Sequence, residues 1–195
     1  MTNPKTTPAA SETMRAIAGA VRFCRFDRAA VAEFDPGLGA AKRSFMAALY
    51  CVPFTIAIIA LDISDAKQQP DDLWLYALVQ AIAYVIHATG FPLAMLSLTR
   101  FLGIVERWPL FVTAQNWLSL PAVAAFSICV VLDYSGSFGQ QMGALLLLLV
   151  QGYVFSVEAF IARVTLGVTA LASIAVVLLD FVIGIAVDRI AVTLL

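Results

Sequence analysis

Five apolar stretches of about twenty residues constrain the fold of this chain more than any other feature. A helix needs about 20 predominantly apolar residues to cross the hydrocarbon core of a bilayer. The stretches cover approximately Ser44–Leu61, Leu73–Leu98, Trp108–Leu132, Gln140–Ala162 and Gly167–Val187. Hydrophobic residues make up 62% of the sequence and charged residues 13%, whereas soluble domains carry roughly 25% charged residues. The sequence therefore predicts an all-α polytopic membrane protein, a bundle of five transmembrane helices with short connectors.

The first and last stretches raise two further points of topology. The first begins at Ser44, and no short apolar segment with a small-residue cleavage site precedes it. We therefore expect an uncleaved anchor rather than a signal peptide. Only a few residues around Arg163 separate the last two stretches. We predict two separate spans there, with a single re-entrant hairpin as the alternative.

Lysine and arginine are distributed unequally between the two ends of the predicted bundle. One end holds ten of the twelve basic residues: Lys5, Arg15, Arg22, Arg25, Arg28, Lys42, Arg43, Arg100, Arg107 and Arg163. The other end holds Lys67 and Arg189. Basic residues accumulate in cytoplasmic segments near transmembrane helices. We therefore expect a multi-pass protein of a bacterial-type inner (plasma) membrane, with its N-terminus in the cytoplasm and its C-terminus outside.

The chain divides into a cytoplasmic N-terminal arm, residues 1–43, and a five-helix transmembrane domain, residues 44–195. Residues 1–11 are polar and contain proline, and we predict that they are disordered. The next segment, to Phe34, carries apolar residues at helical spacing and is predicted to form an amphipathic helix that ends before Asp35-Pro36-Gly37. Its expected apolar face comprises Met14, Ile17, Val21, Cys24 and Val31, from which Phe23 and Phe26 deviate.

Two interpretations of this arm remain open. A basic amphipathic helix beside a membrane anchor is typical of segments that lie in the interface plane. Its membrane-surface residues would be Arg15, Arg22, Arg25 and Arg28, next to anionic headgroups. Alternatively, the helix packs on the cytoplasmic ends of the bundle.

Polar side chains inside the predicted spans are the candidate functional residues. Such groups are costly in a bilayer and usually have a partner or a function. The expected intramembrane polar cluster comprises His87, Gln151, Asp180, Glu158, Asn116 and Gln115. Each of the second, fourth and fifth spans places some of these residues on one helical face, and we expect the three faces to point toward one another.

His87 and Asp180 fall at the same depth in the second and fifth spans. A carboxyl group near the midplane must be paired, hydrogen-bonded or protonated, and His87 is its candidate partner. The pair, with Gln151 alongside, would form either a proton-responsive or substrate-binding centre, or an interhelical hydrogen bond that fixes packing. Glu158 lies nearer the cytoplasmic end, where we expect a structural salt bridge to Arg163.

The sequence carries no HExxH, GxSxG, P-loop, Rossmann or CxxCH motif. We therefore expect no enzyme activity, no cofactor and no metal site. Cys24, Cys51 and Cys129 lack metal-ligand spacing and are predicted to be reduced, small apolar side chains. A net charge of −1 without a basic stripe argues against nucleic-acid binding. The expected partners are the lipid bilayer and a membrane protein or a second copy of the chain.

The layout resembles that of small five-span uncharacterised bacterial inner-membrane proteins and, distantly, of the Yip1-like membrane proteins. The resemblance rests on the basic arm that ends in Lys42-Arg43-Ser44-Phe45, and on Trp108-Pro109-Leu110-Phe111 through Gln115-Asn116-Trp117. The Asp-Leu-Tyr-Gly-Pro-type signature of eukaryotic Yip1 relatives is absent, so no functional residue is carried over. The resemblance implies a membrane-organising or partner-binding role.

Two functions follow from these observations as expectations. The first is a non-enzymatic scaffold, assembly factor or accessory subunit that acts through partners in the bilayer, because the loops are short and no chemical motif is present. The alternative is a small transporter or channel component that uses the midplane polar cluster. Most secondary transporters have more helices and internal repeats, so this role would require an oligomer.

Overall fold

The chain is helical throughout the residues that the computed structural model describes, which are 8–64, 70–136 and 140–195. Lys5, Lys67 and the residues around them lie outside these ranges. Within them, the elements are α1 (Pro8–Phe23), η1 (Arg28–Glu33), α2 (Leu38–Ser44), α3 (Met46–Ser64), α4 (Leu73–Phe101), η2 (Val105–Arg107), α5 (Trp108–Tyr134), α6 (Gln140–Leu166) and α7 (Ala170–Leu194). The η elements are short 3-10 helices.

The five predicted spans are confirmed. In the described part of the chain, α3 together with α2, and each of α4 to α7, are long and apolar enough to cross a bilayer. Large apolar side chains cover the outside of the bundle: Leu148 is 69% exposed and Leu171 79%. Such a surface suits lipid rather than water. The protein is thus a multi-pass membrane protein.

The last two spans are separate helices rather than a re-entrant hairpin. α6 has 27 residues and α7 has 25, and at 1.5 Å per residue each reaches roughly 38–40 Å. The Thr169 side chain accepts a hydrogen bond from the backbone N–H of Ala172 and so caps α7, which begins at Ala170. α6 and α7 both run past the ends of the apolar stretches, because polar residues at a helix terminus remain helical in water or among headgroups.

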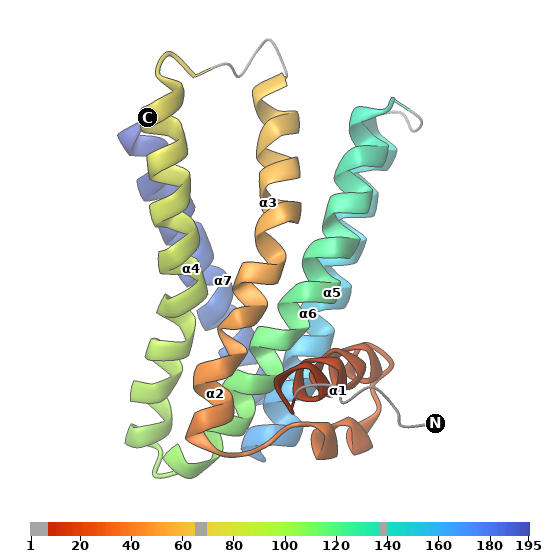
Figure 1. Ribbon diagram of the computed structural model, residues 1–195, viewed down its shortest axis with the longest axis vertical. Helices are drawn as coiled ribbons and strands as arrows, with labels where there is room; N and C mark the ends of the chain where they lie inside the picture. Colours follow the sequence, from red (N-terminus) through yellow and green to blue (C-terminus); the bar gives the residue numbers. More distant parts are fainter. Residues whose placement is uncertain (1–7, 65–69, 137–139) are drawn as a thin grey trace.

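The spans pack in an open arc. α5 packs on α3 and α6, α6 packs on α7, and α7 packs on α4 (Figure 1). The two ends of this arc are α3 and α4, which follow each other in the sequence. The Tyr84 hydroxyl on α4 bridges them by donating to the Ala48 carbonyl oxygen on α3, at 2.5 Å. The arc encloses the space in which the candidate site lies.

Hydrogen bonds between the helices close the arc at the end that carries the N-terminal arm. The indole N–H of Trp108, at the start of α5, donates to the Pro92 carbonyl oxygen in α4 at 2.9 Å. The Arg107 guanidinium donates to the Leu166 carbonyl oxygen at the last turn of α6, at 2.6 Å. Gly167 follows with φ +68°, a left-handed conformation that suits glycine at a helix C-terminus. A Cβ there would collide with the Arg107 guanidinium.

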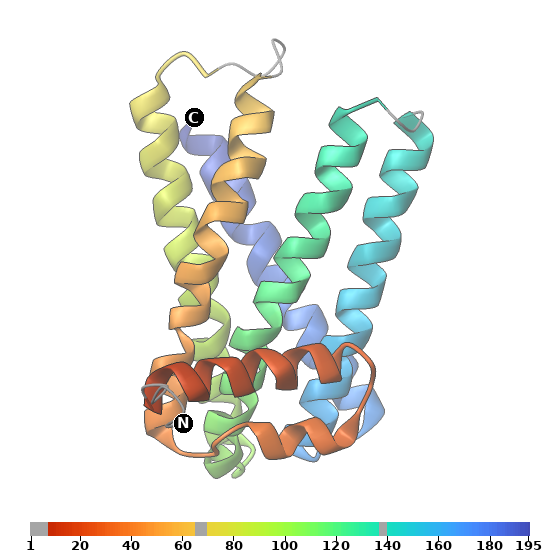
Figure 2. The same cartoon turned by 45° about the vertical axis from the view of Figure 1, so that its right-hand side comes forward.

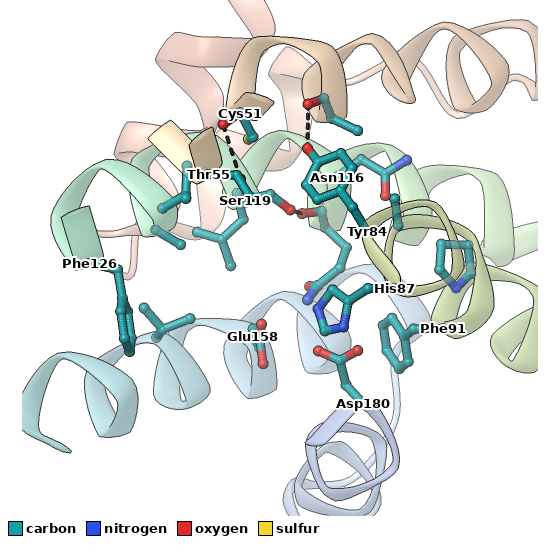
Figure 3. A pocket seen from close by; sticks show the side chains of 18 of the residues that line it. Cys51, Thr55, Tyr84, His87, Phe91, Asn116, Ser119, Phe126, Glu158 and Asp180 are labelled. Carbon is teal, nitrogen blue, oxygen red and sulfur yellow. Dashed lines mark hydrogen bonds between the residues drawn. The ribbon is translucent and has the colours of Figure 1, made fainter. Parts of the chain in front are cut away.

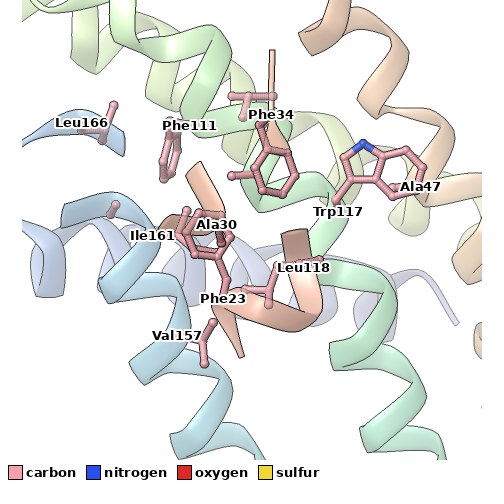
Figure 4. Close-up of a cluster of buried hydrophobic side chains, with 14 of the residues drawn as sticks. Phe23, Ala30, Phe34, Ala47, Phe111, Trp117, Leu118, Val157, Ile161 and Leu166 are labelled. Atoms are coloured by element: carbon pink, nitrogen blue, oxygen red, sulfur yellow. The ribbon is translucent and has the colours of Figure 1, made fainter. Parts of the chain in front are cut away.

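The N-terminal arm packs on the bundle, as the second interpretation of its sequence proposed. Figure 2 shows α1 lying across the spans near one end of the bundle, with η1 running back beneath it. Ala16, Ala20 and Phe23 are buried against the bundle, where α1 contacts α5 and α6. Phe23 lies in the buried cluster together with Phe34 (Figure 4), on whose ring it stacks. It also meets Phe160 of α6 edge to face.

The predicted apolar face of this arm was only partly correct: Ile17, Cys24 and Val31 pack against the buried core, but its other two members, Met14 and Val21, are exposed. Met14 is 69% exposed, whereas Phe23, which deviated from that face, is fully buried. The buried face is built on small residues that bring two backbones close. A Cβ on Gly19 would lie 2.7 Å from the Phe34 ring. Periodicity of large apolar residues therefore pointed to a neighbouring face of the helix.

The extent of the arm helix also differs from the prediction. α1 begins at Pro8, within the segment expected to be disordered, and ends at Phe23 rather than near Phe34. The chain then turns sharply at Phe26, whose φ is +57°. Asp27 caps η1 by accepting from the Ala29 N–H at 2.9 Å. The expected single helix is thus a helix, a turn and a 3-10 helix.

The four arginines assigned to the membrane surface behave differently from one another. Arg22 bridges Asp27 and Glu33, at 2.8 and 2.6 Å, and its guanidinium lowers the pKa of the Asp27 carboxyl below the ordinary value. Arg15 donates to the Glu33 carbonyl oxygen at 3.1 Å. Arg25 and Arg28 are exposed. Arg22 therefore fixes the turn, whereas Arg15, Arg25 and Arg28 are all exposed.

Candidate intramembrane binding site

The arc of spans encloses a cavity of about 400 Å³. Residues of α3, α4, α5, α6 and α7 line it, so it draws on every predicted span. Its lining reaches from Phe45, directly before α3, to Phe126 in the half of α5 that lies farther from the arm. A volume of this size is in the range of small-molecule sites in proteins, about 300–1,000 Å³.

The structure brings together all six residues of the intramembrane polar cluster. His87 comes from α4, Gln115 and Asn116 from α5, Gln151 and Glu158 from α6, and Asp180 from α7, and each lines the cavity. The helical faces inferred from the sequence thus point toward one another. Sequence spacing alone located them because a polar side chain in a span avoids lipid by turning toward the bundle interior.

His87 and Asp180 face each other from adjacent helices (Figure 3). They are close enough to interact electrostatically, although among the described residues they form neither a hydrogen bond nor an ion pair within 4 Å. Gly184, one turn beyond Asp180 on α7, makes room for the imidazole ring: a Cβ there would lie 3.3 Å from His87 Cε1. The two groups are thus neighbours in the wall of the cavity.

The expected salt bridge between Glu158 and Arg163 is wrong. In the described part of the chain Glu158 forms no ion pair, and its carboxylate points into the cavity beside His87 and Asp180 (Figure 3). Five residues along a helix correspond to about 140° around its axis, which places Arg163 on another face, where it is exposed. The sequence suggested this pair because Glu158 and Arg163 are close along the helix axis. The structure excludes it because their side chains point in different directions around that axis.

Two buried polar atoms in this cavity have no hydrogen-bond partner among the described residues: Gln115 Oε1 and Glu158 Oε2. Gln115 is only 9% exposed, and its side chain interacts with the Glu158 carboxyl. Asn116, by contrast, is used structurally, because its amide donates to the Ser44 hydroxyl at 2.9 Å and so joins α5 to α2. The two unsatisfied atoms therefore belong to Gln115 and Glu158, whose side chains interact with each other.

The rest of the lining is apolar or weakly polar. Phe91 and Phe126 contribute aromatic rings, and Tyr84 contributes its ring while its hydroxyl bridges to α3. Sequence reasoning missed Cys51, Thr55 and Ser119, which also line the cavity. Thr55 and Ser119 direct their hydroxyls to carbonyl oxygens one turn earlier in their own helices. Because such self-satisfied side chains are common in spans, the sequence carries no signal that separates them from packing residues.

The fold and the cavity define a class: an α-helical membrane protein with five spans and a polar cavity between them. Comparison with known proteins adds no family to this description. No family model matches the chain, no curated protein is similar to it, and no solved structure is similar to its fold. The resemblance to five-span and Yip1-like membrane proteins stays a prediction.

Proposed function

We propose that this protein is a small non-enzymatic transporter or channel component that takes up a small molecule in its intramembrane cavity. The observation that carries the proposal is the cavity of about 400 Å³, whose lining includes all six residues of the intramembrane polar cluster, from four spans. Polar groups placed only to hold helices together would contact one another across a closed interface. Here they surround a space.

The unsatisfied atoms support the same proposal. A buried polar atom without a partner costs about 1–3 kcal/mol, and Gln115 Oε1 and Glu158 Oε2 are two such atoms in one cavity. A hydrogen-bond donor in the cavity, from water or from a bound molecule, would satisfy both. This residual bonding capacity is what a binding site offers and a packing cluster lacks.

The scaffold, assembly factor or accessory-subunit role expected from the sequence stays a prediction. It rests on the short loops, and the corresponding partner would be another membrane protein. Purification in mild detergent separates the two roles, because a foreign partner in stoichiometric amount supports the scaffold. A homo-oligomer supports transport, since five spans are few for a secondary transporter.

We further propose an orientation in a bacterial-type inner membrane, with the arm in the cytoplasm and the C-terminus outside. Arg43, Arg100, Arg107 and Arg163 lie in elements that meet at the same end of the bundle as the arm (Figure 1). Positive charge at one end favours the cytoplasmic side. A periplasm-dependent alkaline phosphatase fused after Leu195 should therefore be active, and one inserted after Gly103 should be silent. The reverse pattern would overturn the orientation.

Transport requires that the cavity be reached from both sides of the membrane. We expect a cysteine at Ser119, which lines the cavity on α5, to react with a hydroxylated, uncharged methanethiosulfonate that does not cross lipid bilayers, in both right-side-out and inside-out vesicles. The background is Cys24→Ala, Cys51→Ala and Cys129→Ala, so that the new thiol alone reacts. Val182→Cys is the control, since Val182 sits mid-way along α7 and is 59% exposed on its outer surface.

The outcomes of this labelling experiment are distinct. Reaction at position 119 from both sides, with none at position 182, supports a transport pathway. Reaction from one side alone, or from neither, contradicts it. Gel filtration of each variant in detergent confirms that the fold is retained.

A further inference from the structure

We infer that the ligand of the cavity is a small organic cation of the ammonium class, whose charge lies among Glu158, Asp180 and Gln115 and whose apolar part packs on the aromatic lining. This inference rests on the proposed function, since it names the substrate class of the same cavity. It is carried by charge, by an unsatisfied acceptor and by the shape of the lining.

Charge is the first step. The lining holds two carboxyl groups, Glu158 and Asp180, and one imidazole, His87, as its acidic and basic side chains. The two carboxyl groups are close enough to repel each other when ionised. A single imidazole can balance only one of them. A cation between the two carboxylates would remove this repulsion, whereas an anion would add to it.

Hydrogen-bond capacity is the second step. Gln115 is more than nine-tenths buried, lines the cavity, and has an amide oxygen without a partner. Glu158 Oε2 is in the same condition. Both atoms accept hydrogen bonds, and an ammonium group offers donors and carries no acceptor. The free bonding capacity of the site therefore matches a donor ligand.

The lining and its volume are the third step. Tyr84, Phe91 and Phe126 place aromatic rings around the same space (Figure 3), and aromatic faces attract cations, most strongly where water is excluded. A bare metal ion would leave most of 400 Å³ empty. An alkyl- or arylammonium ion fills the volume and uses both the acidic and the aromatic parts of the wall.

The test compares reagents of opposite charge at one position inside the cavity. Ser119→Cys in the cysteine-free background is treated with the aminoethyl methanethiosulfonate, whose ammonium group carries N–H donors, and with the sulfonato-ethyl methanethiosulfonate, and each rate is divided by that of 2-mercaptoethanol in solution. Any change in the thiolate fraction at position 119 affects both rates equally and cancels in their ratio. We expect the cationic reagent to be favoured about tenfold or more, as for clefts of one charge sign.

Removal of the carboxylates should remove this preference. Glu158→Gln together with Asp180→Asn is expected to bring the ratio close to that of the free thiol. Asp188→Asn is the matched control, because Asp188 lies two turns beyond Asp180 near the end of α7 and is exposed; it should leave the ratio unchanged. Equal reaction of both reagents in the unaltered lining would overturn the inference while leaving the cavity and its function intact.

A second measurement leaves both carboxylates in place and therefore remains informative if the Glu158→Gln, Asp180→Asn variant does not fold. Ethylammonium chloride should slow modification of the Ser119→Cys thiol by the uncharged reagent at least about threefold more than sodium ethanesulfonate at equal ionic strength, because the organic cation donates hydrogen bonds within an acidic, aromatic site. Equal effects of the two salts contradict cation binding. If the uncharged reagent reaches position 119 from neither side, the proposed function fails, and this inference fails with it.

Discussion

Phe23→Ala is expected to detach the N-terminal arm from the bundle. Phe23 is fully buried; its ring stacks on Phe34 at 5.4 Å between centroids and meets Phe160 edge to face at 6.1 Å. Truncation of a buried phenylalanine to alanine costs about 3–5 kcal/mol. Among the described residues of α1 the other buried side chains are small, such as Ala16 and Ala20, so Phe23 supplies the largest buried side chain of this helix.

Hydrogen exchange in detergent micelles measures this effect directly. A loss of about 3 kcal/mol should lower the protection of amides in α1 and η1 about a hundredfold, while amides in α5 keep theirs. Met14→Ala is the matched control, since Met14 is on the same helix and 69% exposed. Unchanged protection after Phe23→Ala would mean that the other contacts between the arm and the bundle, such as those of Phe26 with Tyr153 and Phe160, hold the arm in place by themselves.

The arm also shows which part of the fold could not be predicted from the sequence. Its helical pattern gave the presence of a helix, but the face that packs is built from Ala16, Gly19 and Ala20. These residues carry almost no hydropathy signal, and they matter because they allow close approach of η1 and α5. The early end of α1 depends on the turn at Phe26, and a positive φ at phenylalanine is too rare to be expected.

The transmembrane part was predictable to a much larger extent. Spans are recognised by length and apolarity, since a bilayer leaves few alternatives for the backbone. The inward faces followed as well, because the six polar residues avoid lipid. What sequence could not provide is the order of the helices around the cavity. Glu158 illustrates this: its partner was sought on its own helix, while its actual neighbours, Gln115 and Asp180, come from α5 and α7.

His87→Leu is expected to destabilise the bundle more than Asp180→Leu. Removal of His87 leaves Asp180 facing Glu158 without the imidazole as a neighbour, and a stranded polar group in a low-dielectric interior costs about 1–3 kcal/mol. Removal of Asp180 strands His87, but it also relieves the repulsion between Asp180 and Glu158. The melting temperature in detergent should therefore fall after either change, and further after His87→Leu.

The double variant decides whether the two side chains act as a pair. If His87 and Asp180 stabilise each other, exchanging both for leucine should cost less than the two single changes added together. The control cycle combines His87→Leu with Ser173→Ala, since Ser173 lies two turns before Asp180 on α7 and bonds the Ala170 carbonyl oxygen of its own helix. That cycle should be additive. Additivity in the His87–Asp180 cycle as well would show that the imidazole and the carboxyl, although they face each other from adjacent helices, act independently.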